Sequence, residues 1–263
     1  MEPFLDYYAT LASLDLRGYY FLRETAQLES KLRGWGQLPS GERALFRSWL
    51  IMQCRNSNRG ADGRRICGEN LDEVIRRDGH PWAFHEQFSP LAAGRWGGYF
   101  RIHGKRSDVQ WSGADAGRCT VPFREPGRDD VRSWLSDNIE DEWRWTSDNG
   151  PWQLKLQFLP DGGDDEITHV RFEEGATPHV NGLAGNEIVM DGNRNIDEYS
   201  SRWTIRHEYG HVLGFPDCYL EFYDVDEGVM VSYQLDITNL MCSRVGHLQA
   251  KHFDEMKRVY FVP

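Results

Sequence analysis

Two histidines and a glutamate within residues 201–219 have the types and the spacing of a zinc site. His207 and His211 are four residues apart, so on a helix they project from the same face, one turn above the other. Two neutral imidazoles held in this way supply half of a tetrahedral zinc site. Glu208 stands beside the first of them, where a general base for a metal-activated water is needed. The pattern predicts a zinc-binding helix.

The residues after the second histidine complete the expected ligand set. Gly214 follows three residues later, and glycine can adopt the left-handed backbone conformation that ends a helix and turns the chain back. That turn would bring Asp217 to the same metal as a third ligand and leave the fourth position to water. An open fourth position distinguishes a catalytic zinc site from a structural one. The sequence therefore predicts one catalytic Zn²⁺ ion held by His207, His211 and Asp217, with Glu208 as the base.

The full string HExxHxxGxxD resembles the metzincin clan of zinc metalloproteases, with Asp in place of the usual third His. The string GFPDCY over residues 214–219 is similar to the bacterial snapalysins, whose third ligand is that Asp. Metzincins also carry a methionine on a tight turn beneath the zinc, and Met241 within the string NLMCS fits this Met-turn. The close resemblance covers residues 201–245, and a looser one extends back to about residue 117.

The resemblance implies an α+β fold for residues 117–263. This would be a metzincin-like zincin domain with a twisted mixed sheet, an active-site helix, the Met-turn and a C-terminal helix over about residues 247–259. It also implies a secreted hydrolase, a zinc endopeptidase that acts on peptide or protein substrates. In some metzincins a tyrosine two residues after the Met-turn methionine helps to stabilise the oxyanion, but Ser243 stands there. Tyr219 and Tyr233 are the alternatives for that role.

Each of these residues also has an ordinary structural interpretation. HExxH alone occurs by chance on amphipathic helices. Gly214 could be a simple helix stop, Asp217 a turn residue and Met241 a core side chain. All of them together, in this order, favour the catalytic interpretation. Two alternatives are kept: a narrow-specificity processing or toxin-like metalloprotease, and a zinc-containing binding protein without general proteolytic activity.

The five cysteines raise two further questions. Cys67, in the string RRICG, faintly resembles the cysteine switch by which some metzincin propeptides block the zinc, although the flanking Pro and Asp are absent. A thiolate is a good fourth zinc ligand, so Cys67 is a candidate latency ligand, with a structural cysteine in a loop as the alternative. Cys218 and Cys242 lie in two segments that meet under the zinc in a metzincin core. Either a disulfide bond or two buried reduced thiols fits them.

Charge divides the chain into two parts. Residues 1–116 carry a balance of +2 and residues 117–263 one of −13, within a total of −11. The acidic catalytic part argues against a nucleic-acid partner and favours cationic or neutral peptides. The front part has the pattern of helices over residues 3–32, 40–54 and 70–77. It is predicted to be a prosegment that covers the cleft or an accessory domain.

The second part predicts the elements that must position the site. Strands are expected over residues 119–124, 152–159, 167–173 and 187–190, with a helix over 129–145. Two short strands, over residues 99–103 and 109–111, are expected at the end of the front part. We expect a mixed sheet stacked on two helices, with the site below an exposed edge strand. A peptide substrate would add to that edge by strand pairing.

The sequence also bears on the compartment and on calcium binding. No apolar run is long enough for a membrane span, and the N-terminus is acidic where a secretory signal is basic. The chain is thus either cytosolic or without its targeting segment, and the family resemblance favours a secreted or extracytoplasmic monomer. The acidic run over residues 161–166 offers the oxygen ligands that Ca²⁺ prefers, but without EF-hand spacing. A solvated turn is the alternative there.

Overall fold

The structure is a computed structural model that describes residues 3–58, 60, 62–113, 116–160 and 167–261. The chain forms two compact units. The first, here called the helical unit, is Met1–Gly98 with Leu220–Tyr233, and the second, the sheet unit, is Tyr99–Tyr219 with Gln234–Pro263. The boundary expected after residue 116 is therefore wrong in two respects. The described residues from 99 to 116 fold with the sheet unit, and a segment from the second half of the chain folds with the helices.

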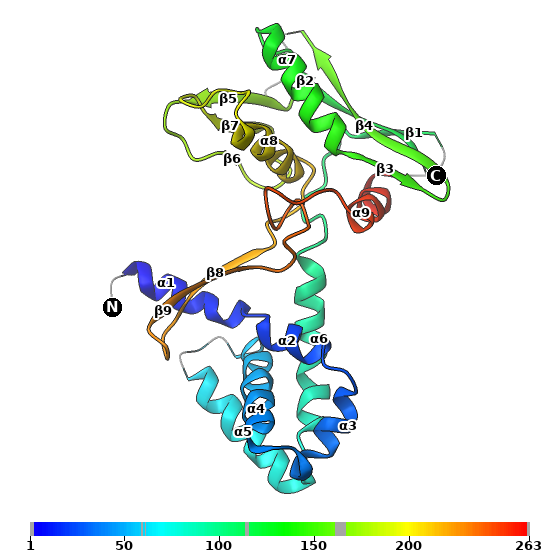
Figure 1. Ribbon diagram of the computed structural model, residues 1–263. Coiled ribbons are helices and arrows are strands. Elements are labelled where there is room, and N and C mark those ends of the chain that lie inside the picture. Colours follow the sequence, from blue (N-terminus) through cyan, green and yellow to red (C-terminus); the bar gives the residue numbers. More distant parts are fainter. Residues whose placement is uncertain (1–2, 59, 61, 114–115, 161–166, 262–263) are drawn as a thin grey trace. The chain divides into compact units, whose positions relative to one another are not determined.

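Helices make up most of the helical unit (Figure 1). Their bounds are α1 Pro3–Leu11, α2 Arg17–Arg23, α3 Leu28–Arg33, α4 Ser40–Arg55, α5 Gly63–Asp78 and α6 Trp82–Gly98, with 3-10 turns at Ala12–Leu14 and Trp35–Gln37. The single helix expected over residues 3–32 is interrupted. Asp15 is one cause, because its buried carboxylate accepts a hydrogen bond from the Arg17 backbone N–H at 3.0 Å and begins α2 there.

The core of this unit lies among α2 to α6. Its fully or nearly fully buried members are Leu22, Leu32, Phe46, Leu50, Cys54, Cys67, Leu71, Phe84 and Phe88. Helix α6 was not predicted, because Pro90 and several glycines weaken its helical pattern. Phe84, Phe88 and Ala92 nevertheless recur every four residues and are all buried. Their packing favours the helix that local propensity alone does not.

A disulfide bond joins Cys54 on α4 to Cys67 on α5, and both residues are fully buried. The predicted loop around Cys67 is wrong, because α5 begins at Gly63. The candidate role of Cys67 as a latency ligand is also wrong for this structure. A sulfur held in a disulfide bond has no thiolate to offer a metal ion.

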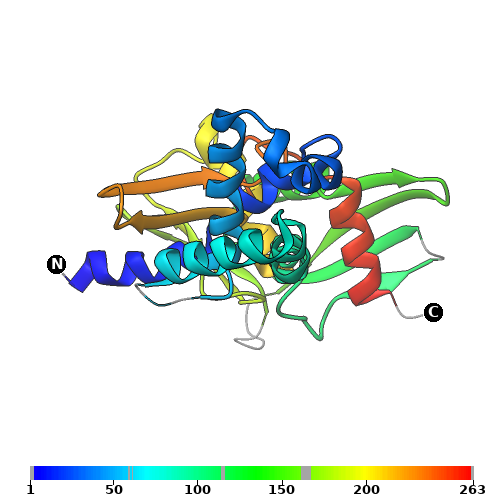
Figure 2. The same ribbon diagram turned by 90° about the horizontal axis from the view of Figure 1, so that it is seen from below.

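A β-hairpin from the second half of the chain completes the helical unit. Its strands are β8 (Tyr219–Asp224) and β9 (Val229–Gln234), and within the described residues they pair only with each other. Figure 2 shows the hairpin in orange beside helices of the same unit. The hairpin and α4 line a shared pocket of about 480 Å³, to which Met52 and Val231 both contribute.

The sheet unit contains two sheets that a bridge connects. Their strand orders are β1-β2-β4-β3 and β5-β7-β6. The bounds are β1 Gln110–Ser112, β2 Gly117–Arg124, β3 Arg144–Ser147, β4 Gly150–Leu159, β5 His169–Glu173, β6 His179–Val180 and β7 Glu187–Asp191. The pairs β2–β4 and β5–β7 are parallel and the others antiparallel. Phe123 bridges to Thr168, and the Arg124 N–H donates to the Thr168 carbonyl at 2.7 Å. The expected α+β class with a mixed sheet is confirmed.

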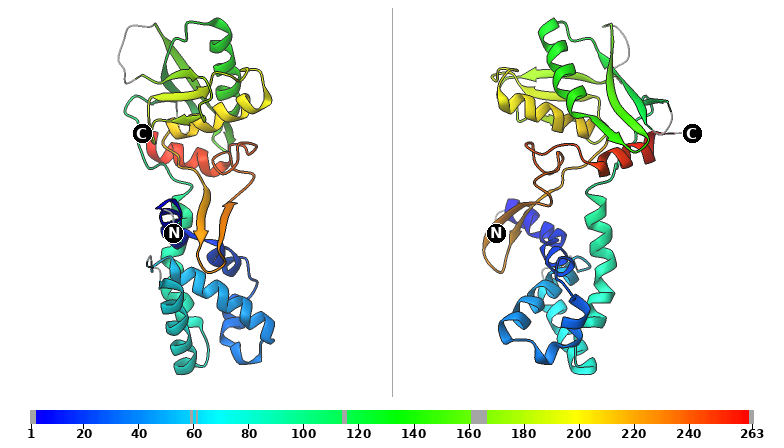
Figure 3. Two further views of the ribbon diagram at one scale, coloured as in Figure 1. Left: turned by 90° about the vertical axis from the view of Figure 1, so that its left-hand side faces the viewer. Right: turned by 45° about the vertical axis from the view of Figure 1, so that its right-hand side comes forward.

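Three helices accompany these sheets. They are α7 (Asp129–Leu135), continued by a π-helical turn over Ser136–Glu140, α8 (Tyr199–Val212) and α9 (Ala250–Tyr260). Helices α7 and α8 lie on one face of the sheet (Figure 3). The predicted helix over residues 129–145 ends early, because its last residues begin strand β3. The strand expected over residues 99–103 is absent, and that described segment is a loop.

Two further expectations concerned a membrane span and a calcium site. In the part of the chain that the structure describes, no helix is long and apolar enough to cross a membrane. The acidic run over residues 161–166, for which calcium was considered, lies outside the described residues.

Replacing Cys54 and Cys67 together by alanine should destabilise the helical unit. The bond closes a loop with a sequence separation of 13 residues, for which the chain-entropy relation gives about 3 kcal/mol. Urea unfolding followed by tryptophan fluorescence measures the change. The control is Cys119→Ala, which removes a buried thiol that is not in a disulfide bond. An equal loss in both variants would show that the bond contributes no more than a buried sulfur.

Candidate metal centre

Helix α8 carries both histidines and the glutamate. Its buried face includes Ile205, Tyr209 and Val212, which fix the helix against the core of the sheet unit. The same packing leaves His207 and Glu208 largely removed from solvent, with Glu208 only 3% exposed. The helix is therefore held by apolar side chains, while its polar residues converge on one small region.

The structure brings the three predicted ligands together. Asp217 Oδ1 lies 3.1 Å from His207 Nε2 and 3.4 Å from His211 Nε2. All three ligand atoms lie within 4.8 Å of one another. A tetrahedral zinc ion with bonds of roughly 2.1 Å separates its ligand atoms by about 3.4 Å. The spacing of these side chains therefore fits zinc.

Hydrogen bonds to the backbone fix how the two imidazoles are protonated. His207 Nδ1 donates to the Leu240 carbonyl at 2.7 Å, and His211 Nδ1 donates to the Phe215 carbonyl at 2.8 Å. In a neutral imidazole the other nitrogen then carries a lone pair. Two such lone pairs face one oxygen of Asp217, so three acceptors meet without a donor. A cation among them, a proton or a metal ion, removes this repulsion, and metal-binding histidines are commonly oriented in this way.

Burial and neighbouring charges shift the pKa values of Asp217, His211 and Glu208. Burial favours the neutral form of Asp217, but the two imidazoles, which donate hydrogen bonds to it once they are protonated at Nε2, outweigh burial and lower the pKa of that carboxyl well below its usual range. Burial lowers the pKa of His211, yet the hydrogen bond and charge of Asp217 outweigh this and raise it overall. Burial also raises the pKa of Glu208, against the opposing effect of the two histidines. Glu208 is thus a stronger base than an exposed glutamate, as a residue that takes up and returns a proton requires.

The chain reverses after α8 at Gly214, as the sequence predicted. Gly214 has a φ of +90°. Its N–H donates to the His211 carbonyl at 2.9 Å, and the Phe215 N–H donates to the Gly210 carbonyl at 3.0 Å. These two bonds form the Schellman pattern of a helix end. The turn places the Phe215 carbonyl against His211 and carries Asp217 back to both histidines.

Met241 lies under α8 in a tight turn over residues 239–242. The Cys242 N–H donates to the Asn239 carbonyl at 3.1 Å, and the Met241 N–H donates to Asn239 Oδ1 at 2.7 Å. A Cβ placed on Gly210 would stand 2.2 Å from the Met241 sulfur. Gly210, between the two histidines, is therefore what lets the methionine approach the helix. The sequence contained a signal for this contact. A glycine inside a helix lowers helix stability by about 1 kcal/mol relative to alanine, so its presence indicates a packing or functional reason.

A disulfide bond between Cys218 and Cys242 ties the ligand segment to this turn. Of the two alternatives left by the sequence, the structure therefore has the bond. The Cys218 N–H also donates to the Met241 carbonyl at 3.1 Å. Because Asp217 directly precedes Cys218, these two bonds hold its backbone against the turn beneath helix α8.

A buried glutamate that the sequence did not single out links α8 to the chain after the turn. Glu142 forms an ion pair with Arg206 on α8. Its other oxygen accepts a hydrogen bond from the Leu248 N–H at 2.7 Å, and His247 Nδ1 lies 3.2 Å from the carboxylate. The neighbouring Trp143 donates its indole N–H to the Arg206 carbonyl at 3.2 Å. Burying this carboxylate is tolerable because its acceptor positions are occupied.

The two tyrosines considered for oxyanion stabilisation differ. The Tyr233 hydroxyl donates to Asp15 at 3.1 Å and accepts from the Leu16 N–H at 2.8 Å. Burial, with the charge of Asp15, raises the pKa of Tyr233 far above its usual value. The hydroxyl of Tyr233 is thus used inside the helical unit, whereas Tyr219 is exposed at the start of β8. Arg244, missed by the sequence analysis, brings a guanidinium nitrogen to 4.0 Å from Glu208 Oε1.

The site therefore gathers the three predicted ligands, the predicted base and the predicted methionine, whereas Tyr233 and Cys67 are engaged in other bonds. Comparisons with protein-family models, with curated proteins and with solved structures found no match for this chain. The chemistry of the site is accordingly inferred from its own residues.

Gly214→Ala should destabilise the sheet unit by about 3 kcal/mol or more. A left-handed backbone costs roughly 1–2 kcal/mol for a residue with a Cβ, and here the Cβ would also stand 1.9 Å from the Gly104 carbonyl oxygen. Gly182→Ala is the matched control, because Gly182 has a φ of +88° and no neighbour within 4 Å of the added atom. Thermal and urea unfolding compare the two. A similar loss in both would show that the contact with Gly104 is unimportant.

Stability should fall as the pH drops from about 6.5 toward 4, because of His252. Burial lowers the pKa of His252 to about 3, with a further contribution from Lys251. Nδ1 accepts from the Gln249 N–H at 2.9 Å, and Nε2 contacts Asn239 Oδ1 at 3.0 Å. In this pH range the unfolded chain binds a proton that the folded chain excludes, so acid favours unfolding, by up to about 3 kcal/mol.

The measurement for His252 is the melting temperature as a function of pH. His252→Gln, which keeps a donor and an acceptor but does not titrate, should flatten the curve between pH 6.5 and 4. His179→Gln, at an exposed histidine of β6, should leave the curve unchanged. An unchanged slope in His252→Gln would contradict the assignment.

Proposed function

We propose that this chain is a zinc-dependent endopeptidase of the metzincin type. The observation that supports the proposal most directly is the meeting of His207 Nε2, His211 Nε2 and Asp217 Oδ1 as three acceptors without a donor. Glu208 on the same helix provides a buried base of raised pKa. The turn at Gly214 after helix α8, and then Met241 beneath that helix, follow the order in which metzincins carry these features.

The three ligands would hold the ion, and the rest of the chain would position the reacting groups. A zinc ion bound there supplies a water of lowered pKa and a Lewis acid for the scissile carbonyl. Glu208 takes the proton of the attacking water and passes it to the leaving amine. Because burial raises its pKa, Glu208 holds that proton more readily than an exposed glutamate would. As an anionic ligand, Asp217 would leave a zinc-bound water less acidic than a third histidine would, so we expect the pH optimum of hydrolysis to lie at or above neutral pH.

An extended peptide has an available strand to pair with. β6 is the last strand in the order β5-β7-β6, and among the residues that the structure describes it pairs with β7 on one side only. The segment after β6 is attached to the ligand helix, because the Ala184 N–H donates to the His211 carbonyl at 2.8 Å. A peptide added to β6 by strand pairing would therefore pass close to the metal ligands. Two disulfide bonds favour an oxidising, extracytoplasmic compartment for this activity.

Glu208→Gln should retain zinc and lose peptide hydrolysis. The substitution keeps the side chain's size and removes its ability to accept a proton, and general-base contributions are typically 10²–10⁴-fold in rate. Metal content after dialysis and cleavage of casein and of a mixed peptide library are the two measurements. Glu174→Gln, at an exposed glutamate outside the site, should behave as the unaltered protein.

The same measurements separate the proposal from its rival, a protein whose zinc is only structural. Bound zinc with no cleavage of any library peptide by the unaltered protein would favour that rival. Full hydrolysis by Glu208→Gln would remove Glu208 from its role. Chelation should abolish cleavage and restoring zinc should recover it, whereas a loss of fold on chelation would indicate a structural ion.

A further inference from the structure

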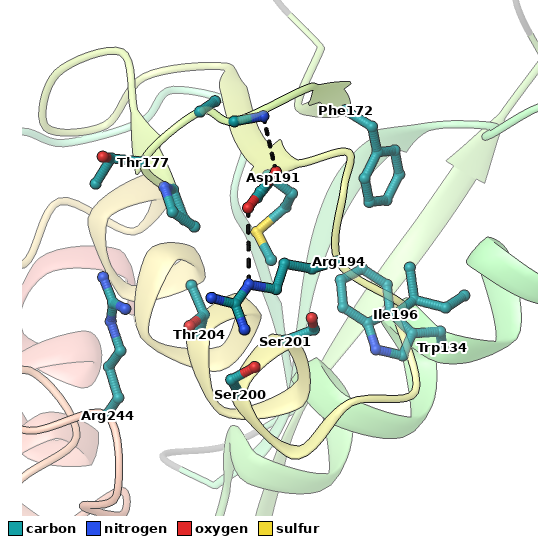
Figure 4. A pocket seen from close by; sticks show the side chains of 14 residues that line it. Trp134, Phe172, Thr177, Asp191, Arg194, Ile196, Ser200, Ser201, Thr204 and Arg244 are labelled. Carbon is teal, nitrogen blue, oxygen red and sulfur yellow. Dashed lines mark hydrogen bonds and ion pairs between the residues drawn. The ribbon is translucent and has the colours of Figure 1, made fainter.

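A pocket of about 340 Å³ lies beside α8 in the sheet unit (Figure 4). This is within the range of small-ligand pockets, at its lower end. One end of it is apolar, with Trp134, Phe172 and Ile196. Two arginines, Arg194 and Arg244, bring guanidinium groups to the rest of it.

The pocket adjoins the proposed base. Ser200 and Thr204 line it, and Glu208 follows them at the same four-residue spacing on α8, so the three share one face of the helix. Arg244 lines the pocket as well, and its Nη2 lies 4.0 Å from Glu208 Oε1. A substrate held at Glu208 therefore has this pocket as its immediate neighbour.

The charges of the pocket are not balanced. Arg194 has two carboxylates near it, Asp191 at 3.7 Å and Glu198 at 3.5 Å. Asp191 is further satisfied by the Gly175 N–H at 2.9 Å, as Figure 4 shows. Within the described residues, Arg244 has only Glu208 as a carboxylate neighbour, at a distance beyond hydrogen-bond length. Its half-exposed guanidinium therefore keeps donors that a ligand can use.

We propose that this pocket binds an acidic side chain of the substrate, glutamate or aspartate, with Arg244 pairing its carboxylate. The inference rests on the proposed peptidase function. Glu208 returns its proton to the leaving amine, so its side of the site is the side of the residue that acquires the new N-terminus. We assign the acidic side chain to that residue. Paired guanidinium and carboxylate groups form bidentate, charge-assisted hydrogen bonds that a neutral amide cannot match.

The proposed preference for an acidic side chain arises within the pocket, although the negative net charge of the chain repels acidic peptides. The acidic balance of the second part favoured neutral or cationic peptides. Charges farther away than about 10 Å are largely screened at 0.1 M salt, whereas Arg244 lines the pocket itself. The contact in the pocket should therefore decide selectivity at this one position, and the distant charges should affect only the rate of encounter.

The test uses four peptides that differ at one position, the residue after the cleaved bond, which is Glu, Gln, Leu or Lys. For the unaltered, zinc-loaded protein we expect kcat/KM to be about tenfold higher for Glu than for Gln, the ratio that one partly exposed charge-assisted pair gives. Arg244→Gln should bring the ratio close to one, and Arg244→Glu should make a Lys peptide better than the Glu peptide. Arg202→Gln is the matched control, since Arg202 lies on α8 and pairs with Asp197 outside the pocket. It should keep the tenfold ratio.

A binding measurement separates this proposal from the peptidase proposal. Calorimetric titration of the zinc-free protein with the Glu and Gln peptides should show about tenfold tighter binding of the Glu peptide, and Arg244→Gln should lose this difference. Discrimination in binding without any cleavage would support the pocket and contradict the peptidase. Cleavage with a ratio near one, or with Leu preferred through the apolar end, would overturn the acidic pocket and leave the peptidase in place. No cleavage and no discrimination would overturn both.

Discussion

The site depends on two hydrogen bonds that imidazole rings donate to backbone carbonyls. The carbonyls of Leu240 and Phe215 take the Nδ1 protons of His207 and His211, and each ring is thereby left with a lone pair facing Asp217. Neither carbonyl belongs to α8 itself. One is placed by the turn that contains Met241 and the other by the reversal at Gly214. The packing around helix α8 therefore holds three mutually repelling acceptor atoms close enough together to bind one cation.

The helical unit includes a segment that lies in sequence between Asp217, the predicted third ligand, and Met241. The β8–β9 hairpin leaves the sheet unit after Tyr219 and returns at Gln234, and Cys218 and Cys242 are joined on either side of it. A prosegment is removed by cleavage, but the hairpin that folds with the front helices would stay with the segment that carries the proposed metal site. This connectivity favours an accessory domain over a prosegment for the front region. It also explains the misplaced boundary, because composition along the chain cannot reveal a segment that folds with distant neighbours.

Local patterns were informative where local physics decides the structure. The spacing of His207 and His211 requires a helix for both rings to share a face, and Gly214 has the left-handed backbone that was expected of it. Strands β2, β4, β5 and β7 follow the patterns that predicted them. Helix α6 was missed because Pro90 and its glycines oppose the helix locally, while burial of Phe84 and Phe88 in a core shared with other helices stabilises it. Cys67 was misassigned because its partner, Cys54, lies on another helix.

The sequence by itself determined the kinds of groups in the site and the order in which they occur, since residue identity and helical spacing are properties of a short stretch of chain. Only the tertiary structure decided which nitrogen of each histidine faces Asp217, why position 210 must be a glycine where Met241 packs against α8, and that Arg244 lines a pocket next to Glu208. Apart from the bond between His211 and Phe215, the contacts involved join residues more than 30 positions apart in sequence, such as His207 and Leu240. Contacts of that kind are selected by the packing of the whole unit, which no single stretch of sequence specifies.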